Sequence, residues 1–166
     1  MISKSILSII ASYASKYTDL VDWFDLKSIN HKHLSINQNA IHILEKNLDK
    51  VDWYFLSKNP NAIHILEKNL NKVQWVSLSQ NINAINILEK NLDEVDWHEL
   101  SCNPNAIHIL EQNFDEVIWS LLSLNPNAIH ILEKHQDKVD WDSLNENPNI
   151  FKNNKRQLVD IILKIL

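Results

Sequence analysis

The stretch that decides the fold is Asn59-Pro60-Asn61-Ala62-Ile63-His64-Ile65-Leu66-Glu67-Lys68-Asn69-Leu70, followed by Val73, Trp75 and Leu78. Similar text surrounds each later tryptophan, and the step from Trp53 to Trp75, 22 positions, recurs up to Trp141. A short fixed period is typical of a tandem repeat whose copies stack on one another. The sequence therefore predicts a repeat scaffold, and it says more about architecture than about chemistry.

Each copy is predicted to contain two short helices. The first begins with Asn59 as N-cap and Pro60 in its first turn. It ends at Asn69, which takes the left-handed conformation that glycine usually supplies, because the chain contains no glycine. The second helix starts near Asn71, with Gln74 (Asp in most copies) in a capping-box position. The predicted caps are Asn59, Asn69, Asn81, Asn91, Asn103, Asn113 and Asn125.

The tryptophans are interpreted as core residues, because each has a leucine three positions later and such a pair would press the second helix onto the first. This predicted structural core is Trp53, Trp75, Trp97, Trp119 and Trp141. The alternative is a stacking platform for sugars or bases. The repeated asparagines have an alternative of the same kind, a recognition row, although helix capping explains them with fewer assumptions.

The predicted fold class is all-α: a right-handed α-solenoid of 22-residue helix-turn-helix repeats with capping helices at both ends. Residues 1–36 are expected to form a degenerate N-terminal repeat and cap, with an insertion over Lys27–His33. Tandem repeats follow over residues 37–150, then a C-terminal capping helix over residues 151–166, all in one continuous domain. The alternative is a leucine-rich-repeat-like solenoid with a strand at Ile63-His64-Ile65, but Leu66-Glu67-Lys68 favours helix.

Composition excludes several classes. The formal net charge is −5, which gives no basic stripe for nucleic acid. The single Cys102 allows no internal disulfide and no second thiol for a metal site, which favours a cytoplasmic protein. No apolar run reaches the roughly 20 residues of a membrane span. The N-terminal residues fit an amphipathic helix better than a signal peptide, so secretion is not expected.

A histidine row is the main candidate for metal chemistry, and it comprises His42, His64, His108 and His130, with Asn86 in the third copy. Neighbouring helices lie about 8–10 Å apart, so this spacing does not define a compact zinc site with bonds of about 2 Å. The alternative is a solvated row in which His64 meets Glu67 or Lys68 on its own helix. We expect no metal, no cofactor and no enzymatic activity, since catalysis needs unique residues at one place.

Blocks such as Asn-Pro-Asn-Ala-Ile-His-Ile-Leu-Glu-Lys-Asn-Leu-Asp-Lys-Val-Asp-Trp resemble the short repeats of proteins from mimivirus-like giant DNA viruses. The resemblance covers about residues 37–150. Departures such as Ile82 for Pro, Asn86 for His and His135 for Asn leave the repeat frame intact. The family supplies no catalytic motif, so the resemblance implies only a viral origin and a scaffold role.

Copies differ most just after each tryptophan, where scaffold residues give way to variable ones. The candidate partner-binding residues are Tyr54, Phe55, Lys58, Val76, Gln80, His98, Glu99, Ser120, Leu121, Leu124, Asp142 and Glu146. Side by side on successive second helices, they would line a surface that suits an extended peptide or a partner helix. The alternative is that these are neutral surface positions that drift freely.

The leading hypothesis is a non-enzymatic scaffold that binds another protein, viral or host, in the host cytoplasm or a virus factory. One alternative is a self-assembling structural component of the virion or the virus factory. Its predicted homodimer contact is the apolar side of the last helix, Leu158, Ile161, Ile162 and Ile165. Another alternative is one-base-per-repeat nucleic-acid binding, against which the acidic charge counts.

Overall fold

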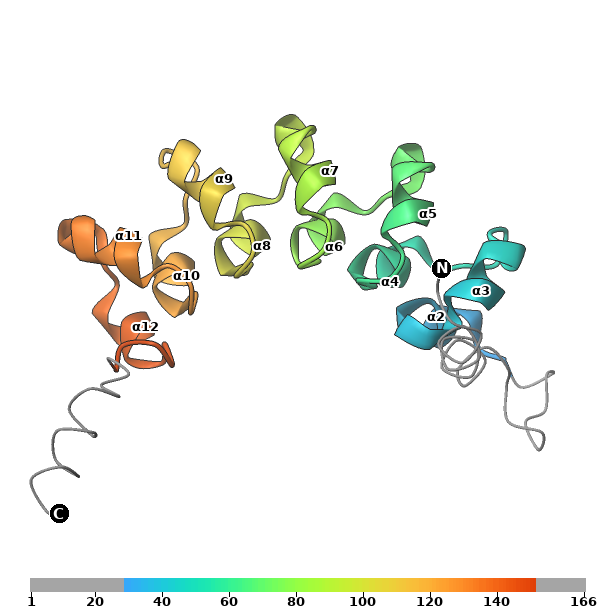
Figure 1. Ribbon diagram of the computed structural model, residues 1–166, viewed down its shortest axis with the longest axis horizontal. Coiled ribbons are helices and arrows are strands. Elements are labelled where there is room, and N and C mark those ends of the chain that lie inside the picture. Colours follow the sequence, from blue (N-terminus) through green and yellow to red (C-terminus); the bar gives the residue numbers. More distant parts are fainter. Residues whose placement is uncertain (1–28, 152–166) are drawn as a thin grey trace, which may run out of the picture. The chain divides into compact units, whose positions relative to one another are not determined.

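The computed structural model describes residues 29–151, and short α-helices alternate there with 3₁₀ turns (Figure 1). No strand forms within that range. The even-numbered helices are α2 (His31–Ile36), α4 (Trp53–Lys58), α6 (Trp75–Ser79), α8 (Trp97–Cys102), α10 (Trp119–Leu124) and α12 (Trp141–Asn145). The odd-numbered helices are α3 (Ile41–Leu44), α5 (Ile63–Glu67), α7 (Ile85–Glu89), α9 (Ile107–Gln112) and α11 (Ile129–Lys134). The 3₁₀ turns are η2 (Gln38–Ala40), η3 (Glu45–Asn47), η4 (Leu70–Lys72), η5 (Leu92–Glu94) and η6 (Gln136–Lys138).

The chain divides into two compact units, Met1–Glu99 and Leu100–Leu166. In the first, α2 packs against α4 and α4 against α6, whereas in the second α10 packs against α12. Within each unit the even helices form one layer and the odd helices another (Figure 1). The predicted all-α repeat class is confirmed. The leucine-rich-repeat alternative is wrong, because Ile63-His64-Ile65 lies in helix α5. The single continuous domain stays a prediction.

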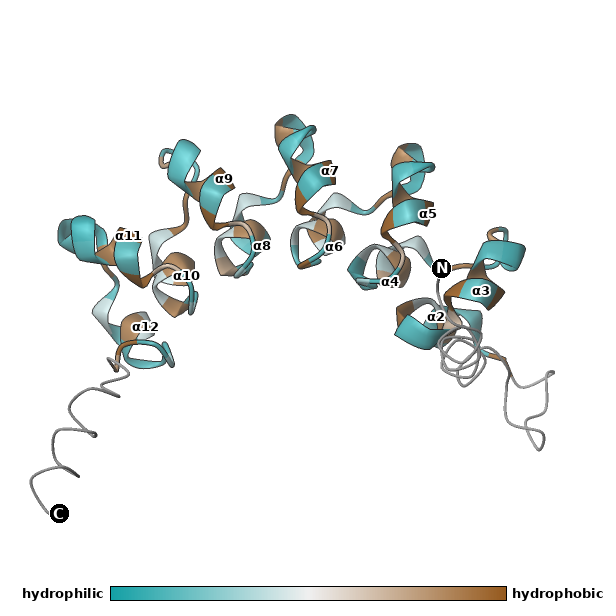
Figure 2. Ribbon diagram, viewed as in Figure 1, coloured by the Kyte–Doolittle hydropathy of each residue, from teal (hydrophilic) through white to brown (hydrophobic). Residues whose placement is uncertain are grey.

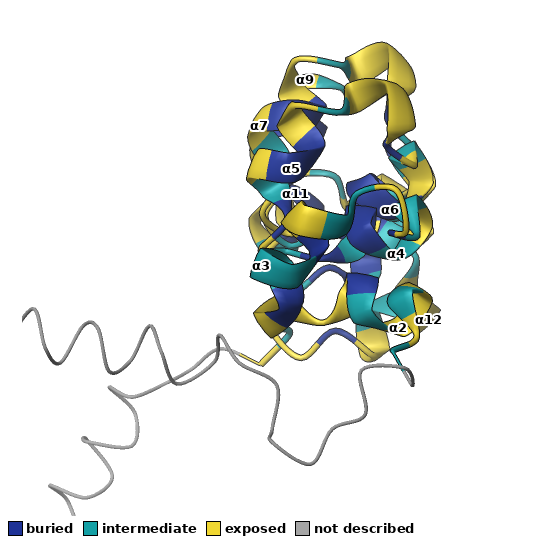
Figure 3. Cartoon of the chain, turned by 90° about the vertical axis from the view of Figure 1, so that its right-hand side faces the viewer, coloured by how far each residue is buried: buried dark blue, intermediate teal, exposed yellow. Residues whose placement is uncertain are grey.

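Leucine forms the core between the two layers. Leu56 and Leu78 of the even helices and Leu66 and Leu88 of the odd helices are fully buried in the first unit. Figure 3 shows buried residues on the inner sides of the helices, and Figure 2 shows hydrophilic outer turns on the odd helices. Each such leucine contributes about 1.5–3 kcal/mol by leaving water, so this periodic row is the main source of stability.

The prediction of a tryptophan core is wrong. Trp53, Trp75, Trp97 and Trp119 are only half-buried, and Trp141 is 61% exposed. Each is the first residue of its even helix, a position that places the ring at the margin of the layer. Lysines of the following repeat cover two of the rings, with Lys72 Nζ 5.1 Å from the Trp53 centroid and Lys138 Nζ 4.9 Å from that of Trp119. The tryptophan rings therefore cover the margin of the even-helix layer, where they remain partly exposed to solvent.

Within each unit, buried asparagines join a repeat to the one before it. Asn81 donates from Nδ2 to the carbonyl oxygens of Ser57 at 2.9 Å and Asn59 at 3.0 Å. Asn59 makes the equivalent bonds to residues 35 and 37, and in the second unit Asn125 and Asn147 repeat the arrangement. These side chains are 0–2% exposed. Their amides thus satisfy backbone carbonyls that water cannot reach.

This row corrects the predicted N-caps. The N-caps of the odd helices are Ala62, Ala84, Ala106 and Ala128, not Asn59, Asn81, Asn103 and Asn125. Residues 60–62 form a turn before the helix, and Asn59 Oδ1 accepts from the Asn61 N–H at 3.0 Å within it. Asn59 therefore folds the turn with one end of its amide and binds the preceding repeat with the other.

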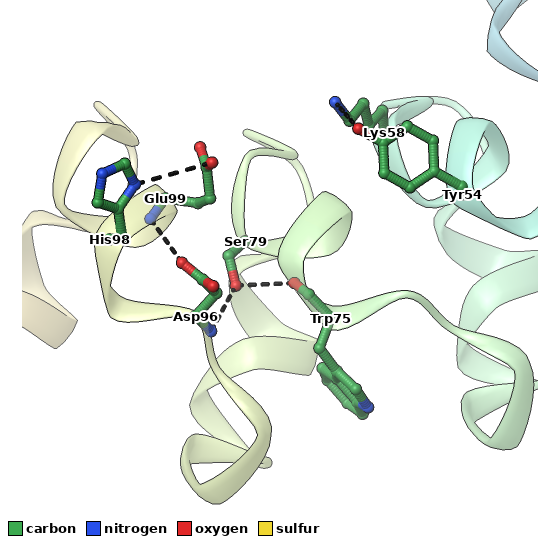
Figure 4. Close-up of polar contacts among 7 residues, drawn as sticks. All are labelled: Tyr54, Lys58, Trp75, Ser79, Asp96, His98 and Glu99. Atoms are coloured by element: carbon green, nitrogen blue, oxygen red, sulfur yellow. Dashed lines mark hydrogen bonds and ion pairs between the residues drawn. The ribbon is translucent and has the colours of Figure 1, made fainter.

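A buried serine row runs parallel to the asparagine row. Ser57 Oγ donates to the Trp53 carbonyl at 2.7 Å and accepts from the Gln74 backbone N–H at 3.1 Å. Ser79 makes the same two contacts with Trp75 and Asp96 at 2.9 and 3.1 Å (Figure 4). Each hydroxyl thus joins the last turn of one even helix to the N-cap residue of the next.

Aspartates cap several even helices. Asp52 Oδ1 accepts from the N–H groups of Tyr54 and Phe55 at 3.0 and 3.2 Å, so it is the N-cap of α4. The predicted capping box is therefore wrong: the aspartate stands before the helix, and the residues near Asn71 form turn η4 instead. Asp140 caps α12 through Ser143, whose backbone and side-chain hydrogen bonds lower the pKa of the Asp140 carboxyl.

The predicted C-cap asparagines do lie where the odd helices end, but not in the left-handed conformation. Asn69 has φ of −136°, and no residue of the described range has positive φ. Its Nδ2 donates to the Ile65 carbonyl at 2.8 Å, and Asn91 and Asn113 bond their helices in the same way. A side-chain amide thus satisfies a terminal carbonyl without the backbone reversal that would require glycine.

Helix α2 extends the repeat toward the N-terminus beyond the predicted limit. Its N-cap Asn30 corresponds to Asp52, and His31 takes the position of Trp53. The regular pattern thus begins inside the segment that was predicted to be an insertion. Most of the N-terminal cap, the C-terminal helix and the dimer residues Leu158, Ile161, Ile162 and Ile165 lie outside the described residues. In the described range, no helix has the length and apolarity of a membrane span.

Candidate interaction surfaces

The variable positions lie on the outer side of the even helices, and none of them is buried. Exposed members are Tyr54, Val76, Gln80, His98, Ser120, Asp142 and Glu146. Half-buried members are Phe55, Lys58, Glu99, Leu121 and Leu124. By contrast, most of the leucines, serines and asparagines that recur from copy to copy are buried. The structure therefore leaves the variable positions available for contact, within each unit.

The variable side chains of helix α4 contact one another and a lysine of α2. Lys58 Nζ donates to the Tyr54 hydroxyl at 3.0 Å and lies 4.6 Å from the centroid of the same ring. The Tyr54 and Phe55 rings meet edge to face with centroids 5.3 Å apart. From α2, Lys32 Nζ lies 5.1 Å from the Phe55 centroid. Two aromatic rings and two amines thus hold one another in place.

The surface continues onto α6 and α8. Val76, in the position of Tyr54, is 49% exposed, and Tyr54 itself is 46% exposed. On α8, His98 Nδ1 lies 3.8 Å from Glu99 Oε1. Figure 4 shows the Tyr54–Lys58 and His98–Glu99 pairs on the same side of these helices, while the Trp75 ring points the other way. Trp75 and the two labelled pairs therefore lie on different faces of these helices.

The second unit presents a different set. Ser120 is exposed, Leu121 and Leu124 are half-buried on α10, and Asp142 and Glu146 are exposed on α12. Beside α12 is a hollow of about 260 Å³, lined by Ile129, Leu132, Glu133, Gln136, Val139, Trp141, Leu144 and Ile150. Leu144 is half-buried there, whereas Leu122, its counterpart one repeat earlier, is fully buried. This end of the unit thus exposes apolar surface.

The histidine row pairs with glutamates of the preceding repeat, not with its own helix as predicted. His64 Nε2 lies 2.6 Å from Glu45 Oε1, and His130 Nε2 lies 3.0 Å from Glu111 Oε1. His42 and His108 continue the row. Among the described residues, no group of three or more His, Cys, Asp or Glu side chains could hold a metal ion. The two pairs therefore link neighbouring repeats within each unit across their exposed margin.

Asn86 interrupts that row and leaves an open notch. The notch has a volume of about 320 Å³ and is lined by Glu67, Leu70, Asn86, Ile87, Lys90 and Asn91. Glu67 holds the position that Glu45 and Glu111 hold against their histidines. Asn86 has a shorter side chain than the histidines at the equivalent positions.

Sequence reasoning missed the inter-repeat asparagine and serine rows. The signal for them was present, because Ser57, Asn59 and Asn61 recur in the same register as Ser79, Asn81 and Asn83. Polar residues that recur in every copy at one phase are expected to serve the stack itself. These residues are therefore structural, and they are not candidates for partner binding.

No protein-family model, curated protein or solved structure matches this chain. The surfaces of the chain are therefore the guide to its function.

Proposed function

We propose that this protein is a non-enzymatic scaffold that binds another protein through the outer face of its even helices. In this proposal the repeats form a right-handed α-solenoid with capping helices at both ends, and the protein works in the cytoplasm. The viral setting, whether host cytoplasm or virus factory, follows from the sequence resemblance alone. Such a scaffold presents a row of variable side chains on helices whose packing is the same in each repeat.

One observation carries the proposal: large apolar side chains are exposed at equivalent positions on neighbouring helices. Tyr54 and Val76 are each about half exposed, and helices α4 and α6 that carry them pack together. Apolar side chains that gather on one face are a common mark of a protein-binding surface. Aromatic anchors such as Tyr54 also supply much contact area for little loss of conformational entropy.

The test is selection of peptides from a random display library against the full chain. We expect enriched peptides whose binding falls at least about tenfold in the double variant Tyr54→Ser/Val76→Ser, since such a loss corresponds to about 1.4 kcal/mol. Leu92→Ser is the matched control, because Leu92 is 37% exposed in turn η5, outside the even helices. Failure to enrich any peptide that depends on Tyr54 and Val76 would refute the proposal.

Self-assembly is the second candidate, and the apolar end of the second unit favours it. Trp141 is 61% exposed beside the hollow that Leu144 helps to line. A second copy could cover this surface, with the predicted dimer residues Leu158, Ile161, Ile162 and Ile165 contributing. Light scattering would then give a mass that rises with concentration and returns to the monomer value in Trp141→Ser. A concentration-independent monomer mass would exclude this candidate.

A further inference from the structure

We propose that the face formed by α2, α4 and α6 binds an extended, acidic peptide segment that also carries an apolar side chain. This inference rests on the proposed function and names the chemistry of the partner.

Contacts with aromatic side chains hold two lysine amines on this face. Lys58 Nζ is held by the Tyr54 hydroxyl at 3.0 Å, and Lys32 Nζ lies over the Phe55 ring at 5.1 Å. Neither amine pairs with a carboxylate within residues 29–151. A lysine ammonium has three donor hydrogens, so one bond to a phenol leaves capacity for an incoming oxygen anion. The amines are thus ordered in advance for a carboxylate.

The variable positions of this face carry positive charge only. Variable positions on α2, α4 and α6 carry Lys32, Lys58, aromatic rings, Val76 and Gln80, and no carboxylate. The first acidic side chain at such a position is Glu99 on α8, beside His98. In a chain of net charge −5 this is a local cationic and apolar surface. It attracts carboxylates over α2 and α4 and repels them near α8.

The side chains of this face follow a fixed order from helix to helix. Lys32, Tyr54 and Val76 occupy equivalent positions on three successive helices. At about 8–10 Å between helix axes, the three helices span about 20 Å, which an extended segment covers with about six residues. A bound segment would match this order if it placed a carboxylate at Lys32 and Lys58. It would also place an aliphatic or aromatic side chain between Tyr54 and Val76. The partner is therefore an acidic segment with an apolar anchor.

Nucleic acid shares the negative charge but fits the face less well. Two amines neutralise few phosphates, and the remaining exposed area at Tyr54 and Val76 is apolar rather than basic. The net charge of −5 also opposes the approach of a polyanion. An oligonucleotide is accordingly an outcome of the test and not the occupant proposed.

The experiment uses the full chain and a fluorescein-labelled eight-residue peptide with the repeat Glu-Leu-Glu-Ser. Counterparts carry Gln or Lys in place of Glu, and oligo-dT of similar length is a fourth probe. Fluorescence anisotropy at low and physiological salt gives each affinity. We expect the Glu peptide to bind at least about tenfold more tightly than the Gln peptide at low salt, and the advantage to shrink as salt rises.

Variants locate the site. Lys32→Gln/Lys58→Gln should remove the advantage of the Glu peptide over the Gln peptide. The matched control Lys68→Gln/Lys90→Gln, which removes two lysines from the ends of the odd helices α5 and α7, should leave it unchanged. Circular dichroism of each variant checks that the helices persist.

The outcomes separate this inference from the proposed function. Library peptides that need Tyr54 and Val76 but are not acidic would overturn the acidic partner and keep the scaffold function. Glu and Gln peptides of equal affinity, or an unchanged advantage in Lys32→Gln/Lys58→Gln, would also overturn it. Oligo-dT that binds more tightly than the Glu peptide through the same lysines would assign the face to nucleic acid. Absence of any peptide that needs Tyr54 would remove both.

Discussion

The buried asparagine row and the exposed histidine–glutamate row join neighbouring repeats in two different environments. Asn81 is 2% exposed and makes two bonds to carbonyls of the preceding repeat, whereas the side chains of His64 and Glu45 are each nearly half exposed. Water can replace a lost partner at the exposed margin but not inside. The sequence reflects this difference in environment. Asn recurs in every repeat at the position of Asn81, whereas the histidine row is interrupted by Asn86.

The strongest challenge to this comparison is Asn81→Ala. The variant leaves the buried Ser57 carbonyl without a donor, whereas the Asn59 carbonyl keeps its bond from the Ala62 N–H. At about 1–3 kcal/mol for an unsatisfied buried group and about 1 kcal/mol for the second lost bond, we expect a loss of about 3 kcal/mol. Urea unfolding followed by circular dichroism measures it. The control is Asn83→Ala, which removes an exposed bond to the Pro60 carbonyl and should cost under about 1 kcal/mol. Equal losses in the two variants would contradict the role given to burial.

A sharper comparison uses two serines that are equally buried. Ser57→Ala removes a hydroxyl that bonds Trp53 and Gln74, and it should cost about 1–2 kcal/mol. Ser77 Oγ is buried without a hydrogen-bond partner, so Ser77→Ala should be neutral or stabilising by up to about 1 kcal/mol. Thermal unfolding of both variants gives the comparison. A larger loss from Ser77→Ala than from Ser57→Ala would show that hydrogen bonding in the serine row does not decide stability.

The smallest effect is expected at the exposed margin. His64→Gln should cost about 0–1 kcal/mol, the usual range of a surface pair. Asn86→His should add a pair with Glu67, in the manner of His64 with Glu45, and raise stability by about 0.3 kcal/mol. Replicate urea unfolding curves at low salt, where ion pairs are least screened, measure these small changes in the free energy of unfolding. A cost for His64→Gln close to that for Asn81→Ala would remove the distinction between the two rows.

The repeat period, the helical class and the burial of Leu66 and Leu78 could be predicted from the sequence, because periodicity reports local structure directly. The burial of the tryptophans could not, since it depends on how far the next repeat reaches over the start of each even helix. The bonds of Asn59 were missed because they join residues 22 and 24 positions apart. Capping rules consider only near neighbours in the chain, so they assigned Asn59 to the helix that follows it.

For the candidate surface, the prediction identified variable positions that the structure leaves exposed or half-buried. It could not foresee that Lys58 lies on the ring of Tyr54, or that Lys32 reaches Phe55 from the preceding helix. Such contacts depend on side-chain conformations across a helix pair. Sequence variation thus indicated a candidate surface, and the geometry shows which side chains on it lie together.

The direction of the asparagine row has a consequence for how the chain is made. Each of these amides donates backward, to carbonyls of the repeat that was synthesised earlier. A ribosome releases the N-terminal repeat of each unit first, so the asparagine of the next repeat follows acceptors that have already been synthesised. Folding within a unit can then advance one repeat at a time during translation, with the last folded repeat serving as the template for the next.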